Sequence, residues 1–435
     1  MSSRVGPRQE VSEDAIALAF TKKYSGWLLF DHDQGCWYEW DGTRWRQDKC
    51  EHAFHYAREL ARSHGDGKRA MGRAAVAAGV EKLAKSDPKH AVNSSIWDDN
   101  PMLLGTPGGT VDLTNGELSA ANPEARITRQ TSVVPEEGEP YLWLAFLDET
   151  FAGDAELVQY VRTWFGYCLT GETREHALAF AYGPGGNGKS VFLNTLAAIM
   201  GDYAVTAALD TFTASRCERH STELAMFRGA RLVTASEIEE GKAWAEAKVK
   251  TLTGGDSVTA RFMRQDYFTY KPQFKLTIAG NHPPALRSVD DAMRRRINII
   301  PFTHKPVAPD RMLEDKLRAE HGRILAWAIV GCLDWQRVGL IQPQAVAVAT
   351  GSYFDEQDVF GQWIADDCIV GPEQWDLPTL LFERWRKYAL AVGVDPMSAQ
   401  TFARELKRRG FASGKSNGSR TYKGICVRRS PFCET

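Results

Sequence analysis

The sequence lacks the features of a secreted or membrane-spanning protein. Its eight cysteines are scattered and form no C-x-x-C pair, so neither a disulfide framework nor a zinc site is expected. The longest apolar run, from Ile324 to Leu333, has ten residues, which is too short to cross a bilayer. The first ten residues contain no apolar stretch of the kind found in signal peptides. We therefore expect a cytoplasmic protein with reduced thiols and no membrane partner.

An excess of charge of either sign is also lacking. The chain has 53 basic and 55 acidic residues among 435, so overall charge gives no signal for nucleic-acid binding. A local signal lies at the C-terminus, where residues 401–435 hold nine Lys or Arg and only two acids. The length exceeds what one hydrophobic core usually supports, which predicts two to four domains.

The most informative motif is a glycine-rich segment. It reads Gly183-Pro184-Gly185-Gly186-Asn187-Gly188-Lys189-Ser190 and fills every fixed position of the phosphate-loop pattern G-x-x-x-x-G-K-[ST]. An apolar run precedes it, and helical spacing follows from Val191, which is the strand–loop–helix context such a loop requires. Its backbone N–H groups can bind phosphates at the positive end of the helix dipole. We predict that these residues and Val191 bind ATP, with Lys189 at the β- and γ-phosphates and Ser190 on Mg²⁺.

Two later strands end in polar residues of the kind that an ATPase needs. Residues 231–236 form a short β-type run before Glu237, and a carboxylate at that position can hold Mg²⁺ and polarise the attacking water. Glu239 and Glu240 compete for this role, and a solvated acidic turn is the alternative. Residues 274–280 form another strand before Asn281, which could sense the γ-phosphate or act only as a turn former beside prolines.

Two further segments carry cations. Residues 258–271 predict a hairpin, and a cation beside an aromatic ring on a projecting loop suits single-stranded nucleic acid, although a hairpin with solvated charges would show the same pattern. Its DNA-binding candidates are Arg264, Gln265, Tyr267 and Lys271.

The Arg triplet at 294–296 precedes an apolar strand. One of these residues could reach the γ-phosphate of a neighbouring subunit, or the triplet could simply end a basic helix.

Together these motifs resemble those of superfamily 3 helicases, specifically the phage and plasmid primase–helicase family, whose relatives include the poxvirus primase–helicase. GPGGNGKS is similar to the phosphate loop of that family, RLVTASE to its Walker B strand, KTLTGGDSVTAR to its B′ motif, LTIAGN to its motif C, and MRRRINIIPF to the arginine-bearing segment that closes the ATPase core. Upstream, WYEWDGTRW and NPMLLGTPGGTVDLTNGEL resemble the helicase-associated N-terminal domain. The resemblance covers nearly the whole chain.

The resemblance implies a role for each matched residue. Ser190 and Glu237 would handle Mg²⁺ and water, and Asn281 would be the first sensor. Lys250 matches a basic residue that contacts ATP across the subunit interface. Arg296 matches the arginine finger, with Arg295 as the alternative. The family also implies a ring hexamer with ATP between subunits and with B′ hairpins that grip single-stranded DNA, usually moving 3′→5′.

The C-terminal segment from Ser398 resembles the winged-helix domain that ends many family members. Phe402 and Leu406 lie one helical turn apart and predict a buried face, whereas Arg404, Lys407 and Arg408 predict a basic one. Such cations would lie where a recognition helix meets DNA. A winged helix that docks a protein remains the alternative.

Primase activity is not expected from this sequence. Longer family members carry a primase or primase–polymerase domain ahead of this region, so a separate primase is an expected partner. Residues 28–33, LLFDHD, superficially fit the metal-binding strand of archaeo-eukaryotic primases. An acidic turn between strands explains them better, because a motif without its structural context is a weak signal.

The predicted fold class is α/β, with an AAA+-like superfamily 3 core. The expected divisions are an N-terminal α+β domain at 1–140, a helical connector at 141–175, the ATPase core at 176–308, a helical segment at 309–345 and the winged-helix domain at 346–435. The predicted function is an ATP-dependent replicative helicase of a phage, plasmid or other mobile element. It would act as a homohexamer on single-stranded and forked DNA in the bacterial cytoplasm. An initiator or loader ATPase without processive unwinding is the alternative, and a small-molecule kinase is disfavoured because no acceptor-binding lid is evident.

Overall fold

The computed structural model describes residues 12–64, 69–214, 222–236, 242–264, 266–286, 290–306, 308–416 and 419–428. The chain divides into two compact units, Met1–Pro284 with Arg295–Val346 and Ala285–Arg294 with Ala347–Thr435. Among the described helices, none has the length and apolar character needed to span a bilayer.

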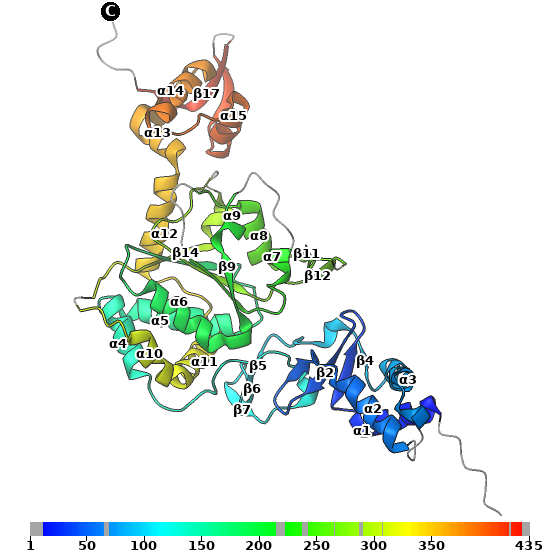
Figure 1. The fold of residues 1–435 in the computed structure, drawn as a ribbon. Coiled ribbons are helices and arrows are strands. Elements are labelled where there is room, and N and C mark those ends of the chain that lie inside the picture. Colours follow the sequence, from blue (N-terminus) through cyan, green and yellow to red (C-terminus); the bar gives the residue numbers. More distant parts are fainter. Residues whose placement is uncertain are drawn as a thin grey trace, which may run out of the picture. The chain divides into compact units, whose positions relative to one another are not determined.

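The N-terminal part of the first unit combines helices with two small sheets (Figure 1). The helices are α1 (Glu13–Tyr24), α2 (His52–His64) and α3 (Ala74–Lys85). A four-stranded sheet has the order β3-β2-β1-β4, and a three-stranded sheet has the order β5-β6-β7. Their bounds are β1 (Leu28–Asp31), β2 (Cys36–Trp40), β3 (Trp45–Gln47), β4 (Ala91–Val92), β5 (Leu103–Thr106), β6 (Gly109–Asp112) and β7 (Glu117–Ser119). Aromatic side chains such as Phe20, Trp37 and Trp45 fill the cores of this region, which explains its high Trp content.

A five-stranded parallel sheet forms the centre of the first unit, and this confirms the predicted α/β class. Its order is β14-β8-β13-β10-β9, and all four strand pairings are parallel. The bounds are β8 (Leu178–Tyr182), β9 (Ala204–Ala208), β10 (Leu232–Ser236), β13 (Lys275–Gly280) and β14 (Ile297–Pro301). Strands β8, β10 and β13 are buried along almost their whole length, as expected for a sheet covered on both faces.

Helices cover this sheet on both faces (Figure 1). On one side gather α5 (Ala155–Leu169), α6 (Lys189–Met200) and α11 (His321–Val338), while α8 (Glu246–Gly254) lies on the other. The indole of Trp164 on α5 donates to the hydroxyl of Thr277 on β13 at 3.0 Å, which fixes α5 against the sheet. The first unit also contains α4 (Tyr141–Thr150), α7 (Thr222–Ala225), α10 (Leu313–Leu317) and the hairpin of β11 (Val258–Ala260) with β12 (Phe268–Tyr270).

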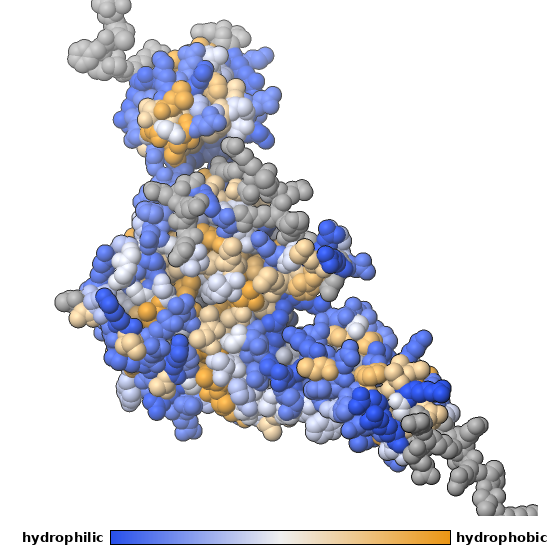
Figure 2. Space-filling model, viewed as in Figure 1, coloured by the Kyte–Doolittle hydropathy of each residue, from blue (hydrophilic) through white to orange (hydrophobic). Residues whose placement is uncertain are grey.

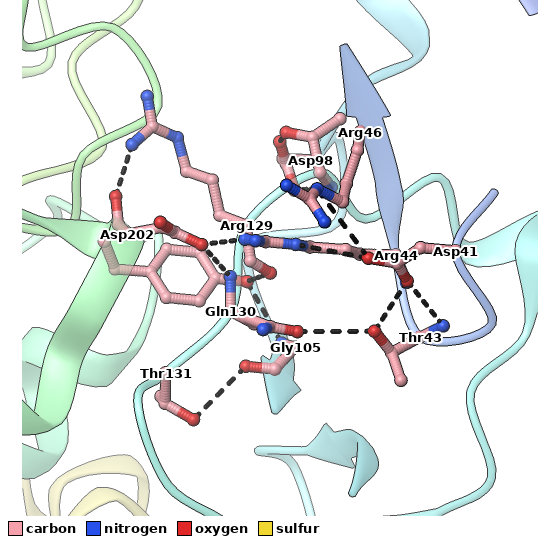
Figure 3. Close-up of polar contacts among 12 residues, drawn as sticks. Asp41, Thr43, Arg44, Arg46, Asp98, Gly105, Arg129, Gln130, Thr131 and Asp202 are labelled. Carbon is pink, nitrogen blue, oxygen red and sulfur yellow. Dashed lines mark hydrogen bonds and ion pairs between the residues drawn. The ribbon is translucent and has the colours of Figure 1, made fainter. Parts of the chain in front are cut away.

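A polar joint ties the N-terminal part of this unit to the edge of the parallel sheet (Figure 3). The carboxylate of Asp202, in the turn before β9, accepts from Arg44 and from the backbone N–H of Gln130. The guanidinium of Arg129 donates to the backbone carbonyls of Asp202 and Arg228. Each partner is a charged side chain or a backbone group. The joint is therefore made of directional hydrogen bonds rather than of apolar packing.

The second unit is a small domain with its own core. It contains α9 (Asp291–Arg294), α13 (Val359–Asp367), α14 (Pro378–Ala391), α15 (Ala399–Arg408) and a sheet of β15 (Cys368–Asp376), β17 (Ser419–Val427) and β16 (Ala412–Ser416), in that order. Helix α12 (Gln344–Gln357) begins in the first unit and continues into the second. Phe402 and Leu406 are buried with Trp363 and Trp385, which confirms the predicted buried face of α15.

Candidate functional site

The phosphate-loop motif forms the turn between β8 and α6. Gly183, Gly186 and Gly188 have φ values of 154°, 79° and 85°, a region that L side chains rarely adopt. A Cβ on Gly183 would clash with the carbonyl oxygen of Phe302, and one on Gly188 would lie 2.8 Å from the ring of Phe146. Around a Cβ on Gly186, by contrast, the described residues place no atom within 4 Å. The loop is therefore packed tightly at its base and open at its crest.

Asn187 fastens the loop to the end of strand β14. Its side chain is 2% exposed. Its amide nitrogen donates to the carbonyl of Phe302, and its amide oxygen accepts from the Lys189 ammonium at 2.9 Å. The backbone N–H of Phe302 in turn donates to the carbonyl of Tyr182 at 2.6 Å. These contacts hold the loop against the end of β14.

Lys189 is folded back into the loop and is only 8% exposed. Its ammonium donates to the carbonyls of Gly183 at 2.6 Å and Pro184 at 2.9 Å, besides Asn187. All three acceptors are neutral oxygens. Burial lowers the pKa of Lys189, and the positive charge of Lys305 lowers it further. Ser190, the next residue, is exposed in the first turn of α6, and Val191 is half-buried.

The predicted sensor residue Asn281 lies at the same edge of the sheet as the phosphate loop. Strand β13 lies between β8 and β10, with Gly280 paired to Tyr182 and Ala279 paired to Ser236. Asn281, which follows β13 directly, is exposed and leaves the sheet beside the phosphate loop. Ser236 ends β10 at the same edge. The predicted carboxylate Glu237 lies outside the described residues.

The two candidate arginine fingers differ in their surroundings. Arg296 is only 9% exposed, and its Nε donates to the hydroxyl of Thr253 on α8 at 3.2 Å. Arg295 is exposed. Lys250, on the same helix as Thr253, is half-buried. A residue that contacts a neighbouring subunit must be accessible, so this geometry favours Arg295 over Arg296, the reverse of the order expected from the resemblance.

The hairpin β11–β12 carries an exposed tip that mixes cations with apolar side chains (Figure 2). Tyr267 is 60% exposed, Arg264 and Lys271 are exposed, and Arg264 has a φ of 62°. The predicted residue Gln265 lies outside the described residues. Sequence reasoning missed Arg261, whose guanidinium lies 4.6 Å from the centre of the Tyr267 ring.

Two apolar residues of the same tip were also missed. Met263 is 77% exposed, and Phe262 is 38% exposed while its ring stacks on Phe268 at 5.7 Å. The register of the hairpin explains the position of Phe262. Because Ala260 pairs with Phe268, the chain beyond Ala260 runs past the Phe268 ring.

The basic helix of the second unit is less basic than its sequence suggests. Arg404, Lys407 and Arg408 are all exposed. The charge of Arg408, however, is partly offset by an ion pair with Glu405 at 2.7 Å. Strands β16 and β17 contribute two more cations, Lys415 and Arg420, which lie opposite each other in the strand register. Like charges placed directly opposite each other are unfavourable, and an anion bound there would relieve the repulsion.

The acidic turn after β1 has a structural explanation. Asp31 is fully buried, and its carboxylate accepts from Ser94 at 2.7 Å, Trp97 at 2.9 Å and Gln34 at 2.7 Å. Burial alone would raise the pKa of Asp31, but these hydrogen bonds lower it overall. The described residues contain no group of three His, Cys, Asp or Glu side chains arranged to hold a metal ion. Asp31 thus closes the turn between β1 and β2.

Two family models match the chain. The first is described as D5 N terminal like and matches residues 17–152. The second is a family of unknown function (DUF5906) and matches residues 181–296. The second match includes the phosphate loop, the hairpin and Asn281.

The curated relatives are viral proteins named as helicases. The chain is 29% identical over 301 residues to "Putative helicase L207/L206" of Acanthamoeba polyphaga mimivirus, covering 62% of the chain and 31% of the relative. It is 26% identical over 298 residues to "Putative helicase 022R" of Frog virus 3, covering 61% of the chain and 28% of the relative. The chain thus spans less than a third of the length of these relatives.

Among solved structures, the fold is similar to the apo structure of the NrS-1 C terminal region. The TM-score is 0.55 at 12% sequence identity, and the match covers 95% of this chain and 99% of the other. At that identity the likeness concerns the fold alone. The helicase-named relatives and the D5 N terminal like match point the same way: the chain is similar to phage and viral primase–helicases.

Proposed function

We propose that this protein is an ATP-dependent DNA helicase of the superfamily 3 type, with an AAA+-like core. The observation that carries the proposal is the arrangement at one edge of the parallel sheet. There the phosphate loop with Lys189 and the exposed Asn281 follow neighbouring strands, while the hairpin with Tyr267 projects from the same unit. An ATP site and a nucleic-acid contact on one rigid core are the two components of a motor.

The residues at the phosphate loop fit a nucleoside triphosphate with Mg²⁺. The glycine conformations leave the crest of the loop free of side chains, and α6, twelve residues long, begins at Lys189. The oxygens that the described residues supply to the Lys189 ammonium are all neutral, so phosphate oxygens can replace them at a gain in free energy. Bound Mg²⁺ would neutralise charge on the phosphates. Ser190 and Glu237 would hold the ion, and Asn281 would orient water.

The proposed DNA contacts lie on the hairpin and on α15. Tyr267 and Phe262 offer exposed rings on which bases can stack, and Arg261 and Arg264 offer cations for the backbone. We propose that the second unit acts as a winged helix, in which α15 would present Arg404 and Lys407 while β16 and β17 would add Lys415 and Arg420.

The assembly and the biological setting are extensions of this proposal. A homohexameric ring would place Arg295 and Lys250 of one subunit at the ATP of the next, and the hairpins in its channel would draw single-stranded DNA 3′→5′. The names of the viral relatives support a helicase. The setting we propose is replication of a phage or other mobile element in its host cytoplasm, with a separate primase.

The test is ATP-dependent strand displacement on a forked duplex, with the wild-type chain and with Lys189→Ala. We expect unwinding by the wild type and none by the variant, because the variant lacks the cation at the phosphates. A loader ATPase would instead hydrolyse ATP on DNA without displacing the strand. Equal unwinding by both chains would exclude the proposed ATP site.

A further inference from the structure

The end of α6 that lies away from the phosphate loop is held by a linker, residues 129–132. The backbone N–H of Asp202, in the turn after α6, donates to the carbonyl of Gln130 at 3.0 Å. A Cβ on Gly201 would lie 2.9 Å from the same carbonyl oxygen, so the linker is packed directly against this end of the helix. Since α6 begins at Lys189 and has twelve residues, about 18 Å of helix joins the linker contact to the phosphate loop.

The hairpin β11–β12 is held at its base by the α7 segment, residues 222–230. The hydroxyl of Tyr270 on β12 donates to a backbone carbonyl of α7 at 2.6 Å. The guanidinium of Arg228 lies 5.1 Å from the centre of the Phe268 ring, and a cation is attracted to the face of such a ring. The Phe268 ring in turn stacks on Phe262, which is one of the rings proposed to contact bases. The α7 segment is thus fixed to the part of the hairpin that supports the proposed DNA contact.

Arg129 joins the end of α6 to the α7 segment. Its guanidinium donates to the carbonyl of Asp202 (Figure 3) and to the carbonyl of Arg228 at 2.6 Å. Its Nε would lie 2.7 Å from a Cβ on Gly229, so the side chain runs directly beside the α7 segment. Both acceptors belong to the backbone, and the guanidinium is a planar, rigid fork. A displacement of either segment therefore moves the main chain of the other or breaks a charge-assisted hydrogen bond.

We infer that Arg129 is a positioning residue that couples nucleotide binding at the phosphate loop to DNA binding at the hairpin. The inference rests on the proposed ATP and DNA sites, and it concerns a residue that belongs to neither. Nucleotide bound at the start of α6 would act on the hairpin through Asp202, Arg129 and Arg228 in turn. Such coupling is reciprocal, so nucleotide changes the affinity for DNA by the same factor as DNA changes the affinity for nucleotide. Arg129 sets the size of that factor.

The test measures the affinity for fluorescent single-stranded DNA with and without a non-hydrolysable ATP analogue and Mg²⁺. The ratio of the two affinities is the coupling factor. We expect this factor to be about fivefold or more in the wild type and close to one in Arg129→Gln, whose shorter neutral amide cannot bridge two carbonyls. The affinities for DNA alone and for the analogue alone should stay at the wild-type values. An arginine with only a structural role would lower the melting temperature and leave the coupling factor unchanged.

Two further variants make the assignment specific to this chain of contacts. Arg228→Gln removes the cation from Phe268 and leaves the backbone carbonyl that Arg129 binds, so it should also lower the coupling factor. Combined with Arg129→Gln it should lower the factor no further, because the two residues act in sequence. Arg126→Gln is the matched control. Arg126 is half-buried as Arg129 is, and its guanidinium lies over the ring of Trp45 at 5.5 Å, so the control removes a comparable contact nearby.

The outcomes separate this inference from the proposed function. If the wild type shows coupling and folded Arg129→Gln retains it, the inference is wrong and the proposed function stands. The inference is also wrong if Arg126→Gln lowers the coupling factor as much as Arg129→Gln does. If Arg129→Gln does not fold, full coupling in Arg228→Gln overturns the inference. If the wild type fails to bind the analogue or DNA, or binds both without coupling, the proposed motor fails and the inference fails with it.

Discussion

Asn187 joins two parts of the nucleotide site through the two ends of its amide. One end donates to the Phe302 carbonyl, and the other accepts from Lys189. We expect Asn187→Ala to lower the free energy of unfolding by about 1–3 kcal/mol, because it leaves a buried carbonyl and a buried ammonium short of a partner. Urea denaturation measures this change.

Asn187→Asp makes a sharper test of the same residue. A carboxylate there would face the Phe302 carbonyl with no proton to donate, and it would also attract the Lys189 ammonium away from phosphate. We therefore expect weaker ATP binding in the Asp variant than in the Ala variant, measured by titration of a fluorescent ATP analogue. Stronger binding by the Asp variant would show that Lys189 does not have to leave Asn187 when nucleotide binds.

At the scale of single elements, the hairpin β11–β12 should couple ATP turnover to movement on DNA. Arg264 has a φ of 62°, so its removal changes both a cation and a strained backbone. We expect Arg264→Ala and Arg264→Gly to lose strand displacement equally and to keep most basal ATPase activity, because the cation is what DNA requires. Only the glycine relieves the strain, by about 1 kcal/mol. Unwinding restored by glycine but not by alanine would assign the effect to the backbone.

The basic face of α15 should contribute to loading on DNA. Truncating the chain at Ser398 is a poor test, because Phe402 and Leu406 help to form the core of the second unit. The double variant Arg404→Gln, Lys407→Gln removes two exposed cations and leaves that core intact. We expect the slope of log affinity against log salt concentration to fall by about 1.5–2.

Two measurements accompany that variant. Basal ATP hydrolysis should stay at the wild-type rate, because neither cation belongs to the nucleotide site. The matched control, Arg386→Gln with Lys387→Gln on α14, removes the same charge from another exposed surface. If the control flattens the salt dependence as much as the α15 variant does, the effect is one of overall charge and α15 is no specific contact.

The elements of the core could be predicted from the sequence, and several of their contacts could not. The phosphate loop, the hairpin and the buried face of α15 follow from local spacing, and the structure forms all three. The attachment of Asn187 to Phe302 joins residues 115 positions apart. Nothing in the local pattern around either residue encodes such a contact. The ion pair of Arg408 with Glu405 could have been predicted from the sequence, since the two lie three residues apart on one helix.

Arg296 shows most clearly what local reasoning leaves out. The position of an arginine directly before an apolar strand does not reveal whether its side chain turns toward solvent or toward the neighbouring helix. In the structure it turns toward Thr253 on α8 and is buried. That choice depends on how α8 packs over the sheet, which only the assembled fold determines.

At the scale of the whole molecule, this burial leads to a prediction about the proposed ring. An arginine finger completes the ATP site of a neighbour, so a chain lacking the finger and a chain lacking Lys189 should complement each other at some interfaces. We expect Arg295→Ala mixed with Lys189→Ala to recover part of the ATPase activity that each lacks alone. Arg296→Ala should instead lower the melting temperature.

The control for this mixing experiment is a demonstration of co-assembly, by pulling down one tagged chain with the other. Recovery with Arg296→Ala but not with Arg295→Ala would mean that Arg296 leaves Thr253 when subunits meet. If neither pair recovers activity although the chains co-assemble, both arginines act within their own subunit, and the ATP site does not lie between subunits.

The central claim is that ATP turnover at the phosphate loop is coupled to single-stranded DNA held by the same chain. The most direct test is the rate of ATP hydrolysis by the purified wild-type chain, titrated with single-stranded DNA in the presence of Mg²⁺. The account predicts a basal rate that rises with DNA to a plateau, and loss of both rates in Lys189→Ala. A rate that does not respond to DNA, or that persists in Lys189→Ala, would contradict the account.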